Sequence, residues 1–203
     1  MNVRGAVLAG GAAARYGGRP KGLQPLGGRR LLDRVIDAVT LAVGALPLLV
    51  ANDPDAPHWR PDLTCVPDRL PGAGSLGGIL TAVAAGDGPV LCVAWDMPFV
   101  TAPLLRALVL DLDGFDVLLP ESGSPRGLEP LCGVYGPACR EPIERAIARG
   151  DLRAIAFHEA VRCGTLSLHR ARAFGDPDEL FFNVNRPEDL VHAEELWRRQ
   201  GSR

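Results

Sequence analysis

The stretch that decides the fold runs from residue 8 to residue 21 and reads Leu8-Ala9-Gly10-Gly11-Ala12-Ala13-Ala14-Arg15-Tyr16-Gly17-Gly18-Arg19-Pro20-Lys21. It follows the apolar residues Ala6 and Val7, which together with Leu8 form a run of the length of a buried strand. The glycines of the loop allow positive φ angles, so its backbone N–H groups can turn toward an anion. Because Arg15 and Lys21 add positive charge, the stretch predicts a phosphate-binding loop.

Lys21 is the only lysine in a chain with 22 basic residues. A bias toward arginine explains why lysine is scarce, but it does not explain why one lysine remains in this loop. A lysine ammonium is a rotatable point charge that can follow a phosphate oxygen, whereas a guanidinium is a planar fork. A solvated surface lysine is the alternative, and we expect a catalytic role for Lys21 together with Arg15. The loop is not a Walker loop, since Pro20 and Gly22 flank the lysine, and it lacks the dinucleotide fingerprint.

The composition indicates one compact domain spanning residues 1–203, with 47% hydrophobic residues and a formal charge of −2. A net charge this close to zero gives no general electrostatic attraction for nucleic acid or for a membrane surface. There is no apolar run of signal or transmembrane length, so we expect a cytoplasmic protein. The cysteines are odd in number and form no Cys-x-x-Cys pair, which argues against a disulfide framework and a zinc site; they are Cys65, Cys92, Cys132, Cys139 and Cys163.

Apolar runs and helical spacings alternate through the first half of the chain. Runs at 47–51, 63–66 and 90–94 predict strands, whereas 31–39, 79–83 and 101–108 predict helices, and Gly44 and Thr101 supply a helix stop and a helix cap. This rhythm predicts an α/β fold of three layers: a mostly parallel, Rossmann-like sheet with helices on both faces. Ligands of such sheets bind at the carboxyl ends of the strands. Gly10, Asp68 and Asp96 all lie at such ends.

The second half is less regular. It predicts a strand at 117–119, a returning strand at 130–135 and a strand at 165–168, with helices at 137–149, 151–157 and 186–199.

Asp96 ends the most strand-like segment, which carries no other charge. Mg²⁺ favours one or two carboxylates together with substrate phosphates and water, and Asp96 with Asp68 would supply the protein side. The alternative is that both aspartates cap a turn or helix. For Asp68 the two interpretations are even, whereas for Asp96 we expect metal binding, because Pro98 fixes the backbone beside it.

Asn183 and Asn185 alternate along an extended segment, so both would face the same side. Paired amides suit recognition of a polar ring. For Asn185 there is an alternative, a capping box with Glu188 at the start of the last helix. Glu129, before Pro130, either orients a ligand or is a strand-edge charge.

Four segments, in order, resemble the molybdenum cofactor guanylyltransferase family and cover nearly the whole chain. They are the loop with Leu8-Ala9-Gly10-Gly11, Arg15 and Lys21; Asp68-Arg69-Leu70-Pro71-Gly72-Ala73-Gly74-Ser75-Leu76-Gly77-Gly78-Ile79; Asp96-Met97-Pro98-Phe99; and Asn183-Val184-Asn185-Arg186-Pro187-Glu188-Asp189-Leu190. The first segment alone marks only a superfamily that includes sugar and cytidylyl transferases. Gly11 is similar to the guanylyl branch of that superfamily rather than the cytidylyl branch.

The resemblance implies a nucleotide-diphospho-sugar transferase-like fold, and transfer of GMP from GTP to molybdopterin cofactor with release of pyrophosphate. It implies Mg²⁺ on Asp96 and, as further partners, cofactor-synthesis proteins or acceptor molybdoenzymes. The implied nucleotide-binding residues are Leu8, Ala9, Gly10, Gly11, Lys21, Asn52, Asp68 and Asp96. The implied substrate-binding residues are Asn183, Asn185 and Arg153, the last against the default interpretation of a surface arginine.

Three positions depart from the family pattern: Ser75 stands in place of Pro, Trp95 in place of a small residue or Cys, and Arg186 in place of Thr. We expect the large Trp95 ring to reshape the acceptor side. Two alternatives stay open: a related nucleotidyltransferase with another phosphorylated acceptor, and a non-catalytic module that binds nucleotide or cofactor.

Overall fold

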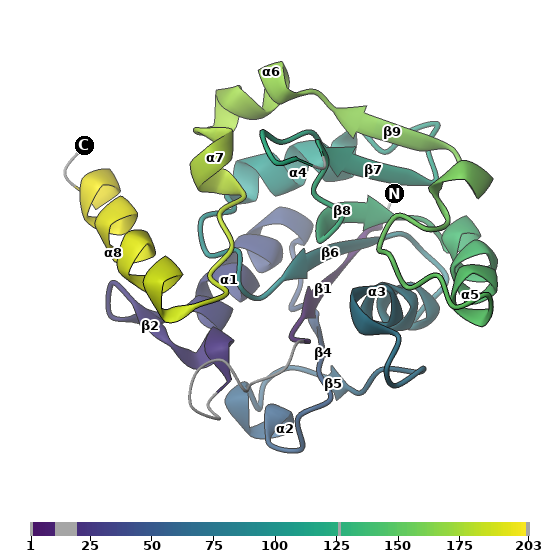
Figure 1. Cartoon of the computed structure of the whole chain (residues 1–203), viewed down its shortest axis with the longest axis horizontal. Coiled ribbons are helices and arrows are strands. Elements are labelled where there is room, and N and C mark those ends of the chain that lie inside the picture. The colour runs from purple at the N-terminus through teal and green to yellow at the C-terminus, as the bar shows by residue number, and fades with distance from the viewer. Residues whose placement is uncertain (1, 11–19, 126, 202–203) are drawn as a thin grey trace.

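A seven-stranded sheet forms the centre of the structure, a computed structural model that describes residues 2–10, 20–125 and 127–201 (Figure 1). The strand order is β5-β4-β1-β6-β8-β7-β9. β8 runs antiparallel to β6 and β7, and the other pairs are parallel. The strands are β1 (Arg4–Leu8), β4 (Leu48–Val50), β5 (Cys65–Val66), β6 (Val90–Ala94), β7 (Val117–Pro120), β8 (Cys132–Tyr135) and β9 (Cys163–Leu166).

Helices cover both faces of the sheet (Figure 1). The α-helices are α1 (Leu31–Val43), α2 (Ala56–Trp59), α3 (Gly74–Ala84), α4 (Ala102–Leu110), α5 (Arg140–Ala148), α6 (Leu168–Ala171), α7 (Pro177–Leu180) and α8 (Pro187–Gly201). Short 3₁₀ turns are η2 (Lys21–Leu23), η3 (Pro137–Cys139), η4 (His158–Ala160) and η5 (Arg172–Phe174). Among the described residues, no helix has both the length and the apolar character needed to cross a bilayer.

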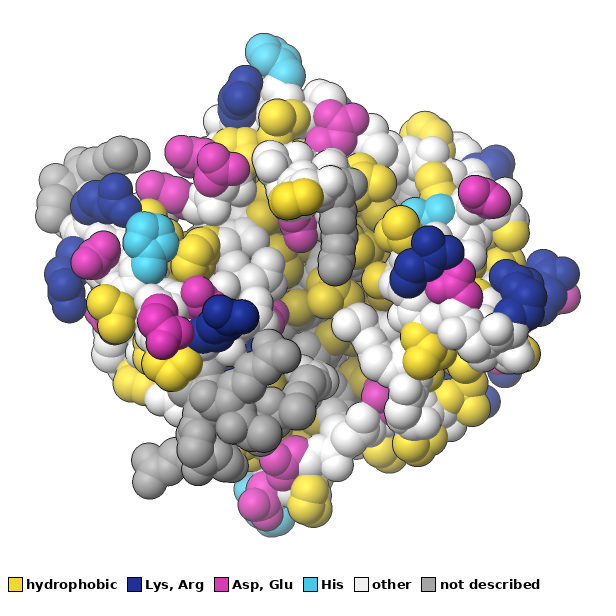
Figure 2. All heavy atoms as spheres, in the orientation of Figure 1, with side chains coloured by type: hydrophobic (Ala, Val, Ile, Leu, Met, Phe, Trp, Pro, Cys, Tyr) yellow, Lys and Arg dark blue, Asp and Glu magenta, His cyan; other side chains and the backbone are white. Residues whose placement is uncertain are grey.

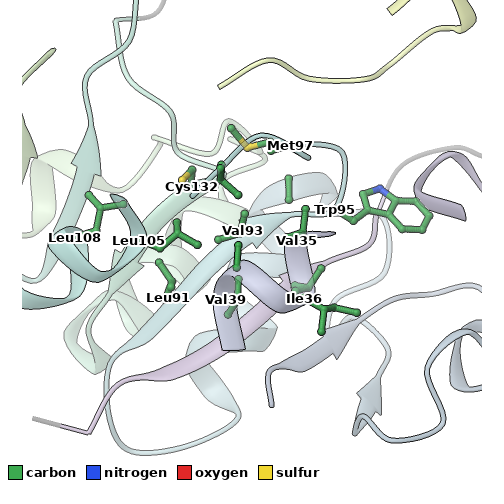
Figure 3. Close-up of a cluster of buried hydrophobic side chains, with 14 of the residues drawn as sticks. Val35, Ile36, Val39, Leu91, Val93, Trp95, Met97, Leu105, Leu108 and Cys132 are labelled. Carbon is green, nitrogen blue, oxygen red and sulfur yellow. The ribbon is translucent and has the colours of Figure 1, made fainter. Parts of the chain in front are cut away.

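The central strands are buried on both faces because successive side chains point to opposite sides. In β6, Leu91 and Val93 belong to one apolar cluster, whereas Val90 and Cys92 belong to the other. Figure 3 shows Leu91 and Val93 against α1 and α4, with Trp95 at the edge of that cluster. The second cluster contains residues of α3 and α5. Each cluster therefore fills the interface between the sheet and the helices on one of its faces.

The helix stop at Gly44 and the helix cap at Thr101, both predicted from the sequence, are present in α1 and α4. The buried side chains of α1 recur at helical spacing, and Gly44 ends the helix in the left-handed region at φ 77°. The side chain of Thr101 accepts a hydrogen bond from the Leu104 N–H at the start of α4.

A third apolar cluster lies beside the main sheet and joins the last helix to a hairpin (Figure 1). The hairpin consists of β2 (Pro25–Leu26) and β3 (Arg29–Arg30), and Leu26 packs with Ala193 and Leu196 of α8. The Arg34 guanidinium stacks 3.7 Å from the Trp197 ring centre. The last helix is thereby held against the hairpin, which follows η2, the turn that carries Lys21.

The predicted α/β class with a mostly parallel sheet and helices on both faces is confirmed. The helix predicted at 151–157 is wrong: the Ala156 and His158 N–H groups bond to carbonyls three residues back, which makes turns rather than an α-helix. β9 lies two residues earlier than predicted. α3 begins at Gly74, so the end of the second glycine-rich turn is already helical.

The five cysteines are free thiols, and Cys92, Cys132 and Cys139 are buried. Burial raises the pKa of Cys139 to about 12, so this thiol stays neutral at physiological pH.

Candidate active site

A cavity of about 970 Å³ lies at the carboxyl ends of the parallel strands. This volume is near the upper end for ligand pockets, so it is large enough for a nucleotide and part of a second substrate. Of the twelve residues that we assign from sequence to catalysis or to nucleotide, metal or substrate binding, nine line the cavity: Leu8, Ala9, Gly10, Lys21, Asn52, Asp68, Asp96, Asn183 and Asn185.

Lys21 and Asp96, 75 positions apart, form an ion pair in this cavity. Their side chains are 17% and 10% exposed, so the pair is largely withdrawn from solvent. The Lys21 ammonium also donates to Asn185 Oδ1 at 2.9 Å. One cation therefore connects the glycine-rich loop, the end of β6 and the segment before α8.

Backbone contacts hold this arrangement in place. The Trp95 N–H bonds to the Leu8 carbonyl at 3.2 Å, and the Val184 N–H bonds to the Asp96 carbonyl at 2.9 Å. The alternative for Asn185, a capping box with Glu188, is not among the hydrogen bonds of the described residues. Asp189 Oδ2 instead accepts from the N–H groups of Asn185 and Arg186, both at 2.8 Å. The Asn185 side-chain oxygen is thus available to Lys21.

Gly22 is in van der Waals contact with the Trp95 ring. A Cβ at Gly22 would lie 2.2 Å from Trp95 Cε3, so only glycine fits there. The Trp95 ring stacks on Trp59 with ring centres 5.3 Å apart, and it is 3% exposed. The Trp95 ring, which we expect to reshape the acceptor side, lines the cavity, and its contacts with Gly22 and Trp59 also support the turn that carries Lys21.

Asn52 and Asp68 form a reciprocal pair at the ends of β4 and β5. The Asn52 amide donates to Asp68 Oδ2 at 2.7 Å, and its oxygen accepts from the Asp68 N–H at 2.8 Å. A Cβ at Gly78 would lie 3.8 Å from Asp68 Oδ1, so α3 packs closely against this pair. The pair fixes one carboxylate on the wall formed by β4, β5 and α3.

The connection between β7 and β8 forms the opposite wall. It contributes Ser124 and Glu129 to the lining, and the Ser122 hydroxyl donates to Glu129 Oε1 at 2.7 Å. The sequence leaves Glu129 open between two interpretations. Trp59 also lines the cavity, but a helical tryptophan carries no local signal of a cavity, and the close contact of Gly22 with Trp95 has no local signal either.

One described site residue expected from sequence, Arg153, does not line this cavity. Arg153 donates to Asp151 at 2.6 Å, and its side chain is 73% exposed. A short-range ion pair therefore holds it at the surface. Gly11 and Arg15 lie outside the described residues. Asn183 lines the cavity, although its amide nitrogen donates to the Phe181 carbonyl at 2.9 Å.

Charged side chains on the face shown in Figure 2 lie mostly around its edge, with both signs interspersed. Within the cavity the balance is different. Among the described lining residues, Lys21 is the one cation, and Asp53, Asp68, Asp96 and Glu129 are carboxylates. A polyphosphate entering such a lining requires further positive charge.

Residues 5–162 match the family described as MobA-like NTP transferase domain. The solved structure of molybdopterin-guanine dinucleotide biosynthesis protein A from Archaeoglobus fulgidus is similar at a TM-score of 0.82, with 28% identity over 97% of this chain and 100% of that one. Fold and family domain together define this chain as a nucleotidyltransferase enzyme.

Full-length relatives narrow the class further. The molybdenum cofactor guanylyltransferase of Desulfosudis oleivorans is 37% identical over 95% of this chain and 94% of its own length. A probable molybdenum cofactor guanylyltransferase of Pelotomaculum thermopropionicum is 34% identical over 95% of this chain and 92% of its length. The chain belongs to the MobA-like family of molybdenum cofactor guanylyltransferases.

Proposed function

We propose that this enzyme transfers GMP from GTP to the terminal phosphate of molybdopterin cofactor and releases pyrophosphate. The observation that carries the proposal is the contact of Lys21 with both Asp96 and Asn185 inside one cavity. The relatives named above are guanylyltransferases of the molybdenum cofactor, and their sequences cover the full span of these residues.

The reaction is an in-line displacement at phosphorus. An oxygen of the acceptor phosphate forms a bond to the α-phosphorus of GTP, and the bond from that phosphorus to the oxygen bridging toward the β-phosphorus breaks. The nucleophile is already anionic at neutral pH, so no general base is needed. Catalysis then depends on positioning and charge stabilisation, which the geometry of Lys21 supplies.

Each side chain of the cluster has a role in this proposal. Lys21 binds triphosphate oxygens when they replace Asp96 at its ammonium group, and Asn185 keeps the ammonium aligned. Asn52 and Asp68 bind the nucleoside side, where the Asn52 amide fixes the Asp68 carboxylate. Asn183 and Asn185 border the acceptor.

A divalent cation fits the donor set of this cavity. Mg²⁺ takes one or two carboxylates, with phosphate oxygens and water for its other positions. Asp96 is a largely buried carboxylate, and in this structure it pairs with the Lys21 ammonium. The described residues include no group of three or more His, Cys, Asp or Glu side chains placed to hold a metal ion together. In this proposal the substrate phosphates and water would complete the coordination. When bound, the metal would neutralise charge between the α- and β-phosphates.

The test is pyrophosphate release with a matrix of nucleotides and acceptors. GTP, CTP and ATP are each combined with purified molybdopterin cofactor, with a sugar 1-phosphate or with no acceptor. The proposal predicts that pyrophosphate is released only when GTP is combined with molybdopterin cofactor. Release that prefers a sugar phosphate would identify a different acceptor, and tight GTP binding without turnover on any acceptor would identify a non-catalytic module.

A further inference from the structure

The connection between β7 and β8 presents a carboxylate that the proposed chemistry does not use. Its backbone is fixed at Glu129, whose N–H bonds to the Pro120 carbonyl at 3.1 Å and whose carbonyl accepts from the Cys132 N–H at 3.0 Å. The residue lines the cavity. Glu129 is therefore held at both sides of its backbone while its side chain borders the ligand space.

Hydroxyl groups orient this carboxylate. Ser122, which is 9% exposed, donates to Glu129 Oε1 at 2.7 Å, and its own oxygen lies 2.8 Å from Ser124 Oγ. No described residue donates to Glu129 Oε2. One oxygen is thus anchored by the protein, and the other can accept from a ligand together with the remaining lone pairs of the first.

The place of Glu129 in the sheet assigns it to the acceptor half of the cavity. β6 lies between β1 and β8, and the Ala94 N–H bonds to the Leu131 carbonyl at 2.8 Å. Asn52 and Asp68 follow β4 and β5, beyond β1, whereas Glu129 precedes β8 on the other side of β6. Asp96, at the end of β6, lies between the two halves.

A pterin carries a ring N–H and an adjacent exocyclic NH₂ on its 2-amino-4-oxo-pyrimidine edge. A carboxylate is the group whose two oxygens match such a pair of parallel donors. We propose that Glu129, oriented by Ser122, binds this edge of the acceptor and selects for a pterin. The inference rests on the proposed function. Guanine has the same edge, so the same chemistry on GTP is the competing source of the donors.

The chain offers a matched control on the same connection. Glu121 also accepts from a hydroxyl, that of Thr165 at 3.0 Å, and from the Leu168 N–H at 2.9 Å, but it does not line the cavity. Replacing either glutamate by glutamine keeps the side-chain shape and removes the charge. Only Glu129→Gln should affect substrate binding.

Steady-state kinetics with GTP and purified molybdopterin cofactor are measured for the wild type, Glu129→Gln and Glu121→Gln. Binding of unsubstituted pterin, which has the edge but no phosphate, is followed in parallel by its fluorescence. We expect Glu129→Gln to raise the KM for the cofactor and the dissociation constant for pterin by about 10- to 100-fold. The KM for GTP, the preference for GTP over ITP and the Glu121→Gln values should stay unchanged.

Two results would overturn the inference. A raised KM for GTP with a lost preference over ITP would place guanine at Glu129, and unchanged pterin binding and cofactor KM would remove the role altogether. If Glu129→Gln lowers the thermal midpoint strongly, Ser122→Ala provides the second test and should weaken pterin binding in the same direction. A wild type that binds pterin but transfers no GMP would contradict the proposed function and not this inference.

Discussion

Replacing Gly22 by alanine tests whether the packing beneath Lys21 sets its position. The added Cβ would lie 2.2 Å from Trp95 Cε3, which is 1.2 Å short of the 3.4 Å at which ordinary contact begins. The Trp95 ring cannot retreat freely, because it stacks on Trp59 and is 3% exposed. Either the ring or η2 must move by about 1 Å, and η2 carries the Lys21 ammonium.

A misplacement of about 1 Å in a catalytic group can lower the rate by about 100-fold. Overpacking of this kind typically destabilises a fold by about 1–3 kcal/mol. We therefore expect Gly22→Ala to reduce kcat/KM for GMP transfer by about 100-fold while the protein remains folded. The assays are steady-state kinetics and urea unfolding. Gly201→Ala is the control, because a Cβ at Gly201 would lie more than 4 Å from the heavy atoms of the described residues around it.

A second variant separates packing from other causes. Trp95→Leu removes the six-membered ring that the new Cβ meets. Gly22→Ala should therefore lower kcat/KM by a smaller factor in a Trp95→Leu background than in the wild type. Wild-type kinetics for Gly22→Ala, or strict additivity of the two substitutions, would refute the packing argument.

Two further predictions concern single side chains. Lys21→Arg and Lys21→Ala should each lose about 100-fold or more in kcat, because a planar guanidinium cannot take the place of an ammonium between Asp96 and Asn185; near-normal turnover of either variant would contradict this. Burial lowers the pKa of His158, and its Nε2 has no hydrogen-bond partner among the described residues, so the unfolded chain takes up a proton near pH 6.5 before the folded chain does. Stability should therefore fall as the pH falls below about 6.5, and urea unfolding at two pH values should show a smaller fall for His158→Gln than for the wild type.

The layers of the fold follow from short-range signals in the sequence. Helical spacing and a glycine stop predict α1, and apolar runs predict β4 and β6, because these patterns depend on burial of one stripe or of both faces. The segment 151–157 has apolar residues at a helical spacing, yet Asp151 accepts from the Arg153 N–H and the chain continues in tight turns. Local hydrogen bonding by aspartate competes with the helix there.

The candidate site was predictable where it depends on strand ends. Lys21 and Asp96 could be placed together because parallel strands bring their carboxyl ends to one edge. The fit of Gly22 against Trp95 was not predictable, because it depends on the packing of residues 73 positions apart. Arg153 was assigned from resemblance alone, and the structure pairs it with Asp151 instead.

The central claim is that Lys21 and Asp96 act on one triphosphate during GMP transfer. The most direct test supplies the wild type and the Asp96→Asn variant with GTP labelled at the α-phosphate, purified molybdopterin cofactor and Mg²⁺. The rate at which each protein forms the labelled guanine dinucleotide is measured. We predict one labelled dinucleotide per pyrophosphate for the wild type, and a loss of about 1,000-fold for a folded Asp96→Asn variant. Equal rates for the two proteins would contradict the account.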